Sequence, residues 1–145
     1  EQLLRHLSPA IADSYHRMVL LDALVFNTDR HPYNFGVLRD QATGLPLALA
    51  PIFDHNLSLS AALADYDRFT AGETDSLYLD WCRLADSQPE SVASINRQVI
   101  ESLLNPLHVP GFPEEEKQRV IGILAARWEK LREQISQYRT NPEHK

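Results

Sequence analysis

The sequence predicts a mainly helical single domain with one small β-hairpin. Three observations support this fold class: apolar residues recur at helical spacing near both ends of the chain, a turn-rich spacer separates two short apolar runs near residue 40, and no segment is repeated. Of the 145 residues, 43% are hydrophobic, which is sufficient for one core. We therefore treat residues 1–145 as one domain, with a loop-and-hairpin segment at 27–56 and a helical remainder at 57–145.

The first predicted helix covers residues 9–26. Ser8 followed by Pro9 is typical of an N-cap and a first helical turn. Apolar spacing of three and four residues follows at Ile11, Tyr15, Met18, Val19 and positions 22–25. Pro32 and several residues whose side chains hydrogen-bond to their own backbone then oppose a continued helix, so residues 27–34 are predicted to form a loop.

The β-hairpin is predicted from the apolar runs at residues 35–39 and 45–52. The spacer between them is rich in turn-forming residues and has Gly44 near its end. Pro46 and Pro51 lack the backbone N–H that a central strand requires, so the second strand is expected to be short or to lie at an edge.

The helical remainder has no clear boundaries in its first half, where Gly72 interrupts the pattern. After Pro89 a one-sided apolar stripe predicts a helix that stops at Asn105 and Pro106; its members are Val92, Ile95, Val99 and Leu103. The last helix begins after Pro113 with three glutamates, whose charge suits the first turn of a helix. Its predicted apolar face consists of Val120, Ile121, Leu124, Trp128, Leu131, Ile135 and Tyr138.

Charge and cysteine content exclude several classes of protein. Against 14 Lys and Arg stand 20 Asp and Glu, a net charge of −6, so no direct nucleic-acid interface is expected. No apolar run reaches the roughly 20 residues that cross a bilayer, and the start lacks a signal-peptide pattern. Cys82 is alone, so it predicts neither an intrachain disulfide nor a zinc site. We expect a cytoplasmic protein without a membrane partner, and its first residue, Glu1, suggests part of a longer polypeptide.

Polar side chains gather on both sides of the predicted hairpin. Because a hairpin brings its two ends together, Asp29 and Asp54 are expected to lie side by side. One Asp, one Asn and a second Asp suit phosphoryl transfer, in which one carboxylate orients a hydroxyl and the other ligands hold Mg²⁺ against nucleotide phosphates. The spacing of five positions from Asp29 to Asn34 equals that of a protein-kinase catalytic loop. Singly, each of these residues also suits a cap or a turn brace.

The runs Asn-Thr-Asp-Arg-His-Pro-Tyr-Asn-Phe-Gly at 27–36 and Ala-Pro-Ile-Phe-Asp at 50–54 resemble the catalytic core of HipA-like Ser/Thr kinases of bacterial toxin–antitoxin systems. The order Asp-Arg-His-x-x-Asn is also similar to that of phosphatidylinositol kinases. The resemblance covers residues 22–60, and the remainder agrees in general character with the all-helical second lobe of that fold. It implies the C-terminal lobe of a protein-kinase-like fold.

The resemblance also implies roles for individual residues. Asp29 would accept or orient the substrate hydroxyl, Asn34 would act in catalysis as a magnesium ligand, and Asp54 would be the ligand that bridges magnesium and the phosphates. His31 is a further candidate catalytic residue that either hydrogen-bonds a phosphate or holds the loop. Arg30 is expected to pair with a carboxylate such as Asp22. The implied cofactors are ATP and Mg²⁺, the implied substrate is a protein, and the resemblance allows an antitoxin-type protein partner.

The departures from the kinase pattern lie in the phosphate clamp. Such kinases place a Gly-rich loop and a strand Lys before the catalytic loop, whereas here the first Lys is Lys117 and the glycines form no G-x-G-x-x-G pattern. We therefore expect a missing N-terminal lobe and poor activity of this chain alone. Three alternatives stay open: a catalytically silent pseudokinase-like interaction module, a lipid or small-molecule kinase, and, most weakly, a transition-metal hydrolase using His16, His31 and His55.

Overall fold

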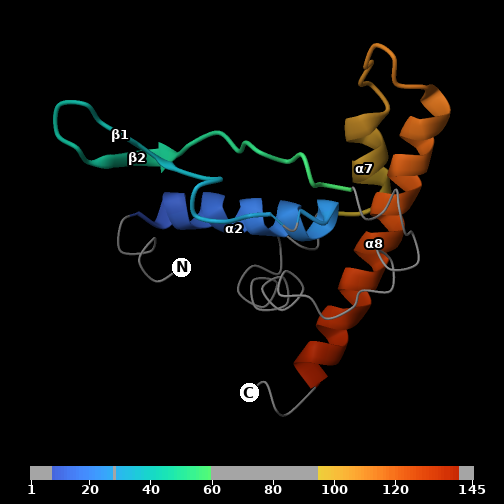
Figure 1. Ribbon diagram of the computed structural model, residues 1–145. Coiled ribbons are helices and arrows are strands. Elements are labelled where there is room, and N and C mark those ends of the chain that lie inside the picture. Colours follow the sequence, from blue (N-terminus) through green and yellow to red (C-terminus); the bar gives the residue numbers. More distant parts are fainter. Residues whose placement is uncertain (1–7, 28, 60–94, 141–145) are drawn as a thin grey trace.

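The computed structural model describes residues 8–27, 29–59 and 95–140, with side chains as far as residue 133. Within these ranges the elements are, in chain order, α2 (Pro9–Val25), β1 (Val37–Arg39), β2 (Pro46–Leu49), α7 (Arg97–Leu104) and α8 (Glu114–Thr140) (Figure 1). This confirms a mainly helical chain with one small antiparallel sheet. None of the helices in these ranges combines the length and the apolar character needed to cross a membrane. The predictions for Gly72, Cys82, Pro89 and Val92 lie outside the described residues.

The helix α2 carries the hairpin and crosses α8, which in turn carries α7. Ser8 has an extended backbone and Pro9 follows at the first helical position, where its missing N–H removes no intrahelical hydrogen bond. The helix ends one residue before the predicted end, because Phe26 adopts the left-handed conformation with φ 54°. The Asp22 carbonyl then accepts hydrogen bonds from the Phe26 N–H and from the Asn27 N–H, the latter at 2.8 Å. This closure turns the chain sharply into the loop that follows.

The hairpin lies over the first part of α2, where the ring of Tyr15 packs on Phe35 with centroids 5.3 Å apart (Figure 1). The strands pair Val37 with Leu49 and Leu38 with Ala48, and the register shifts at the next pair. Both strands are shorter than predicted, since β2 starts at a proline and ends before another, and neither proline can donate to a ladder.

Asp40 closes the hairpin turn. Its carboxylate accepts hydrogen bonds from the Thr43 hydroxyl and N–H, both at 2.7 Å, and from the Ala42 N–H at 3.1 Å. These bonds, that of the Thr43 hydroxyl foremost, lower the pKa of the Asp40 carboxyl. Gly44 completes the turn with φ 69°, a conformation that a side chain would strain.

The helix α7 buries a different face from the one that the sequence predicted. Its N-cap is Asn96, whose side-chain oxygen accepts a hydrogen bond from the Val99 N–H at 3.0 Å. Ile100 is the buried residue, at 4% exposure, and Leu104 packs partly buried against the core. Val99 and Leu103, which were predicted to face inward, are 36% and 65% exposed. Two apolar stripes compete on this short helix, and packing against α8 selects the one that contains Ile100.

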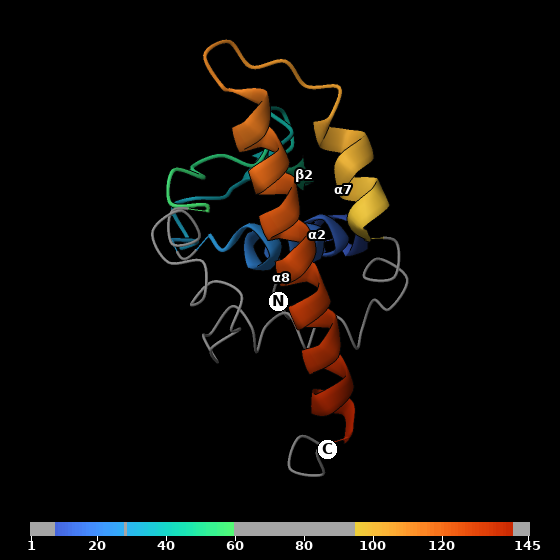
Figure 2. The ribbon, with the colours of Figure 1, turned by 90° about the vertical axis from the view of Figure 1, so that its right-hand side faces the viewer.

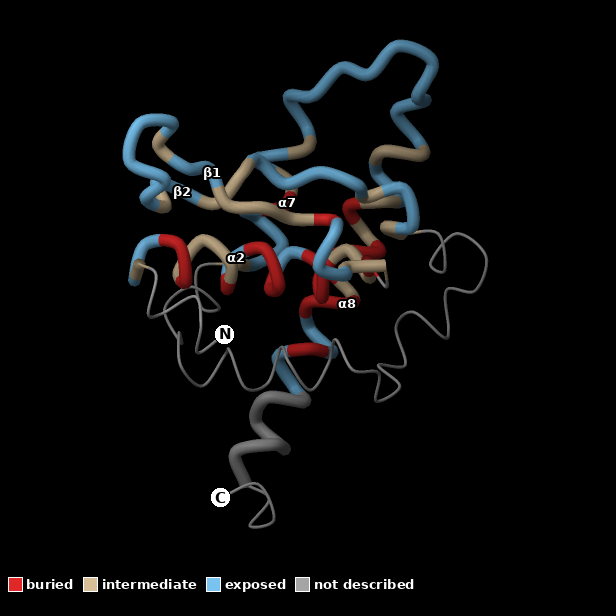
Figure 3. The backbone as a smooth tube through the Cα atoms, turned by 60° about the vertical axis from the view of Figure 1, so that its left-hand side comes forward, coloured by how far each residue is buried: buried red, intermediate tan, exposed pale blue. Residues whose placement is uncertain are grey.

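The helix α8 begins with Glu114, Glu115 and Glu116 in its first turn, as predicted, and crosses the C-terminal end of α2 (Figures 1 and 2). Its predicted core positions Ile121, Leu124, Trp128 and Leu131 are buried, Val120 is partly buried, and the side chains of Ile135 and Tyr138 lie outside the described part. Burial is concentrated on α2 and on α8 where the two cross, whereas the hairpin tip and the α7–α8 connection are exposed (Figure 3). The core unites three helices; its buried members are Met18, Val19, Leu20, Ala23, Leu24, Ile100, Ile121, Leu124, Trp128 and Leu131.

Candidate functional site

The loop that precedes the hairpin and the segment that follows it lie side by side over α2 (Figure 1). A backbone hydrogen bond joins them next to the strands, from the Ala50 N–H to the Gly36 carbonyl at 2.8 Å. At the far end the Leu59 N–H donates to the Val25 carbonyl of α2, also at 2.8 Å. The hairpin therefore brings the loop of Asp29 and the segment of Asp54 to one place, as its geometry predicted.

A buried ion pair between Asp22 and Arg30 lies beneath these two segments. The guanidinium binds the carboxylate through two parallel hydrogen bonds, Nε to Oδ2 at 2.7 Å and Nη2 to Oδ1 at 2.9 Å. The two side chains are only 1% and 6% exposed, and the Asn27 amide also donates to Oδ1 at 2.9 Å. The sequence predicted this partner for Arg30, but not that the pair is buried. Chiefly because of the Asp22 hydrogen bond, the pKa of Arg30 is raised, and the charges of Asp54 and Asp29 act in the same direction.

Arg30 also joins the two segments to each other. Its Nη1 donates to the Asn34 carbonyl at 2.5 Å and to the Phe53 carbonyl at 2.9 Å. Its Nη2 lies 3.1 Å from Nε2 of His55. A guanidinium only donates, so Nε2 is the acceptor in this contact and a neutral His55 carries its hydrogen on Nδ1. One buried side chain thus connects α2, the loop and the segment after the hairpin.

Asn34 braces the loop from within. It is 4% exposed, its N–H donates to the His31 carbonyl at 2.9 Å, and its side-chain Nδ2 donates to the Asp29 carbonyl at 2.8 Å. Its Oδ1 has no hydrogen-bond partner among the residues that the structure describes, and a carbonyl-type oxygen of this kind is a ligand for a hard cation. The amide therefore has one end that holds the loop and one end that is available.

The two carboxylates of the site are not engaged by the described part of the chain. Neither the Asp29 nor the Asp54 carboxylate makes a hydrogen bond or ion pair there, although the negative charge of each helps to raise the pKa of Arg30. Carboxylate and amide oxygens of this kind suit Mg²⁺ better than a softer metal. Within residues 8–27, 29–59 and 95–133, no group of three or more His, Cys, Asp or Glu side chains is arranged to hold a metal. Mg²⁺ that bridges to phosphates does not require such a group, since one or two protein ligands suffice.

Asp54 has an unusual backbone conformation. Its φ of 60° lies in the left-handed region, which an aspartate adopts more readily than a bulky residue. Residues held in such regions cost about 1–3 kcal/mol each and concentrate at functional sites. The Arg30 contacts to the preceding carbonyl and the following ring hold this conformation in place. No sequence pattern indicated it.

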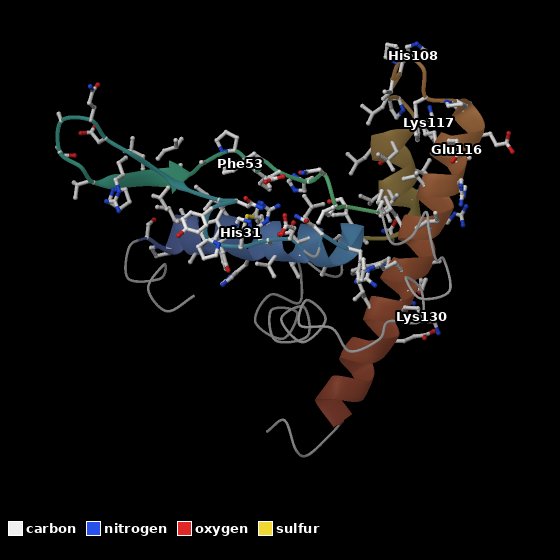
Figure 4. All side chains as sticks on the ribbon, viewed as in Figure 1. His31, Phe53, His108, Glu116, Lys117 and Lys130 are labelled. Atoms are coloured by element: carbon white, nitrogen blue, oxygen red, sulfur yellow. The ribbon has the colours of Figure 1, made fainter. Side chains whose placement is uncertain are left out.

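His31 lies on the loop over α2, and Phe53 lies on the segment that returns after the hairpin (Figure 4). His31 is exposed, and its Nδ1 accepts a hydrogen bond from the Tyr33 N–H at 3.2 Å. Its ring meets the Tyr33 ring edge-on with centroids 5.9 Å apart. Of the two roles that the sequence left open for His31, this contact corresponds to holding the loop.

His16 and Lys117 lie away from this site. His16 is buried in α2, whereas His55 belongs to the Arg30 network, so the described part offers no cluster for the transition-metal alternative. Lys117, the first Lys of the chain, lies on α8 beside the α7–α8 connection (Figure 4). Its Nζ donates to the Asn105 carbonyl at 2.9 Å and pairs with Glu114 at 2.8 Å, so it fastens that connection.

Arg127 of α8 is a structural residue that sequence reasoning missed. It is 2% exposed, its Nε donates to the Ala23 carbonyl at 2.8 Å, and its guanidinium lies 4.7 Å from the centre of the Phe26 ring. A cation at this end of α2 satisfies one of the last carbonyls of the helix and complements the helix dipole. The available signal was an arginine beside Trp128, within the apolar face of α8. Arg127 fixes the helix end from which the site loop starts.

The fold and the site together define a mainly helical domain in which a hairpin joins an Asp–Asn loop to a second aspartate. In comparisons with known proteins, the chain matches no family model, no curated protein and no solved structure.

Proposed function

We propose that this chain is the catalytic lobe of an ATP- and Mg²⁺-dependent kinase that phosphorylates a protein Ser or Thr hydroxyl. The observation that carries the proposal is the meeting of the Asp29–Asn34 loop with the Asp54 segment, both fastened to one buried arginine. Phosphoryl transfer depends almost entirely on positioning and electrostatic stabilisation, and a preorganised set of oxygen ligands supplies both.

The roles follow from the chemistry of each oxygen. Asn34 Oδ1 and the Asp54 carboxylate would hold Mg²⁺, which neutralises charge on the phosphates when bound. The Asp29 carboxylate would accept the hydrogen bond of the substrate hydroxyl and orient it for attack. The described part of the chain gives this carboxylate no competing cation partner, which leaves it available for that hydroxyl.

The resemblance of residues 22–60 to HipA-like kinases supports the same assignment and is the ground for a protein acceptor and an antitoxin-type partner. The sequence contains no Gly-rich phosphate loop and no Lys before Lys117. We therefore propose that a further lobe supplies the phosphate clamp and that this chain alone is a poor catalyst.

A catalytically silent interaction module is the second candidate. Three large apolar side chains beside Asp54 are exposed, namely Ile52 at 41%, Phe53 at 46% and Leu57 at 44%. Exposed apolar residues grouped in this way are typical of a surface that another protein or lobe covers. A kinase for lipid or small-molecule hydroxyls is a variant of the first proposal, because the choice of acceptor depends on surface loops rather than on Asp29, Asn34 and Asp54.

Nucleotide binding separates the two candidates. Binding of ATP should be measured by calorimetry with and without Mg²⁺, on the longest natural polypeptide that contains this sequence and on its Asp54→Ala variant. The kinase proposal expects Mg²⁺-dependent binding that the variant loses. Partner binding that is insensitive to both Asp29→Ala and Asp54→Ala, without any nucleotide binding, would instead support the interaction module.

A further inference from the structure

We propose that Arg30 is a positioning residue that holds the ligand oxygens of the site in register. The inference rests on the proposed function, because it assigns Arg30 a part in binding the Mg²⁺–nucleotide complex. Arg30 would act through its neighbours and would not touch the cation or the substrate.

The contacts of Arg30 reach each of the three site residues through an adjacent group. Arg30 follows Asp29 in the chain, and its Nη1 binds the backbone carbonyl of Asn34. On the other segment it binds the Phe53 carbonyl and faces the His55 ring, so its contacts bracket Asp54 on both sides. A displacement of this one guanidinium would therefore move the loop and the segment relative to each other.

All five N–H groups of the guanidinium are engaged. Nε and one Nη2 hydrogen bind Asp22, the second Nη2 hydrogen faces His55, and the two Nη1 hydrogens bind the carbonyls of Asn34 and Phe53. Because the guanidinium is planar and all of its N–H groups are bound, it can adopt only one orientation here. No N–H remains for a phosphate oxygen, which assigns Arg30 to positioning rather than to substrate binding.

Lysine cannot replace this function. It would keep the positive charge beside the buried Asp22, but its single ammonium lacks the fork that reaches two carbonyls and a ring at once. Residues that orient ligands from outside the first coordination sphere typically change metal affinity about 10–100-fold when mutated. Arg30→Lys should thus retain the folded domain and lose affinity for the cation–nucleotide complex.

The test measures the dissociation constant of Mn²⁺·ATP, with Mn²⁺ as the spectroscopic probe for Mg²⁺. It compares the wild type, Arg30→Lys, His55→Ala and the double variant in the longest natural polypeptide that contains this sequence. Near-UV circular dichroism establishes that each variant is folded. Amide hydrogen exchange without ligand is followed at residues 53–56, with the core of α8 as the internal control.

We expect Arg30→Lys to weaken Mn²⁺·ATP binding by about tenfold or more, with faster exchange at 53–56 and unchanged exchange in α8. His55→Ala should weaken binding less, and the double variant should stay within about twofold of Arg30→Lys, because both changes act through one contact. A folded Arg30→Lys protein that binds within about twofold of the wild type overturns the inference and leaves the proposed function standing.

If Arg30→Lys does not fold, His55→Ala decides: weaker binding supports the inference and unchanged binding overturns it. A wild type that does not bind Mn²⁺·ATP overturns the proposed function, and the inference with it.

Discussion

The Asp22–Arg30 pair and the Arg97–Glu101 pair have the same N–O separation of 2.7 Å and differ in burial. Asp22 and Arg30 are 1% and 6% exposed, whereas Arg97 and Glu101 are 65% and 37% exposed. Removal of one partner from a buried pair leaves an uncompensated charge away from water, whereas an exposed pair is screened. Burial therefore decides which of these residues matters for stability.

Asp22→Ala is expected to destabilise the folded chain by about 3–5 kcal/mol, because it strands the buried Arg30 charge. Glu101→Ala is the matched control and should cost less than about 1 kcal/mol. Urea unfolding of this chain and both variants measures the difference. Equal losses in the two variants would contradict the account of the buried pair.

Asp54 combines backbone strain with an exposed carboxylate that has no partner in the described part of the chain. Asp54→Gly should leave the free energy of unfolding within about 1 kcal/mol of the wild type, because Gly relieves the strain but gains freedom in the unfolded state. The same variant should lose Mg²⁺-dependent ATP binding, measured by calorimetry. A loss of stability above about 2 kcal/mol would mean that Asp54 is a structural residue.

At the scale of the elements, the hairpin turn carries a pH dependence. The pKa of Asp40 is lower in the folded chain than its ordinary value of 3.8, so its contribution to stability is present above that value and is lost as pH falls through the folded pKa. The difference in unfolding free energy between the wild type and Asp40→Ala should thus be constant near neutral pH and shrink below about pH 4. Urea unfolding from pH 7 to pH 3 tests this. A difference that widens in acid would contradict it.

The two faces of α7 provide a further test. Ile100 is 4% exposed within the three-helix core, whereas Leu103 is 65% exposed. Ile100→Ala should cost about 2–5 kcal/mol, since it removes buried volume from the core. Leu103→Ala should cost less than about 0.5 kcal/mol in the same unfolding experiment. A larger loss of stability in Leu103→Ala than in Ile100→Ala would mean that α7 buries the face that the apolar spacing predicted.

How far the sequence predicted each element depends on how local its cause is. The start of α2 was predictable because Ser8 and Pro9 are local signals, and the hairpin was predictable from its spacer. The buried face of α7 was not, because apolar spacing over eight residues fits two faces and only contact with α8 chooses between them. The left-handed Asp54 was not predictable either, since contacts from Arg30 hold it.

At the scale of the whole molecule, α2 connects the core to the site. Its C-terminal half packs against α7 and α8, and the same helix supplies the carboxylate of Asp22 that holds Arg30. Arg127 of α8, which is far from α2 in the sequence, binds the end of α2. The meeting of the Asp29 loop with the Asp54 segment was predictable, because a hairpin joins its own ends. The buried arginine that fixes their spacing became visible only in the folded chain, because it depends on contacts among three separate segments.

The most direct test of the central claim is phosphate transfer from Mg²⁺·ATP, read by intact mass. It compares the longest natural polypeptide that contains this sequence with its Asp29→Ala variant, with protein and lipid acceptors offered to both. The account predicts added phosphate on the polypeptide or an acceptor with the wild type, and none with the variant. No transfer by the wild type to any acceptor, together with no binding of Mg²⁺·ATP, would contradict the assignment of Asp29, Asn34 and Asp54 to a kinase site.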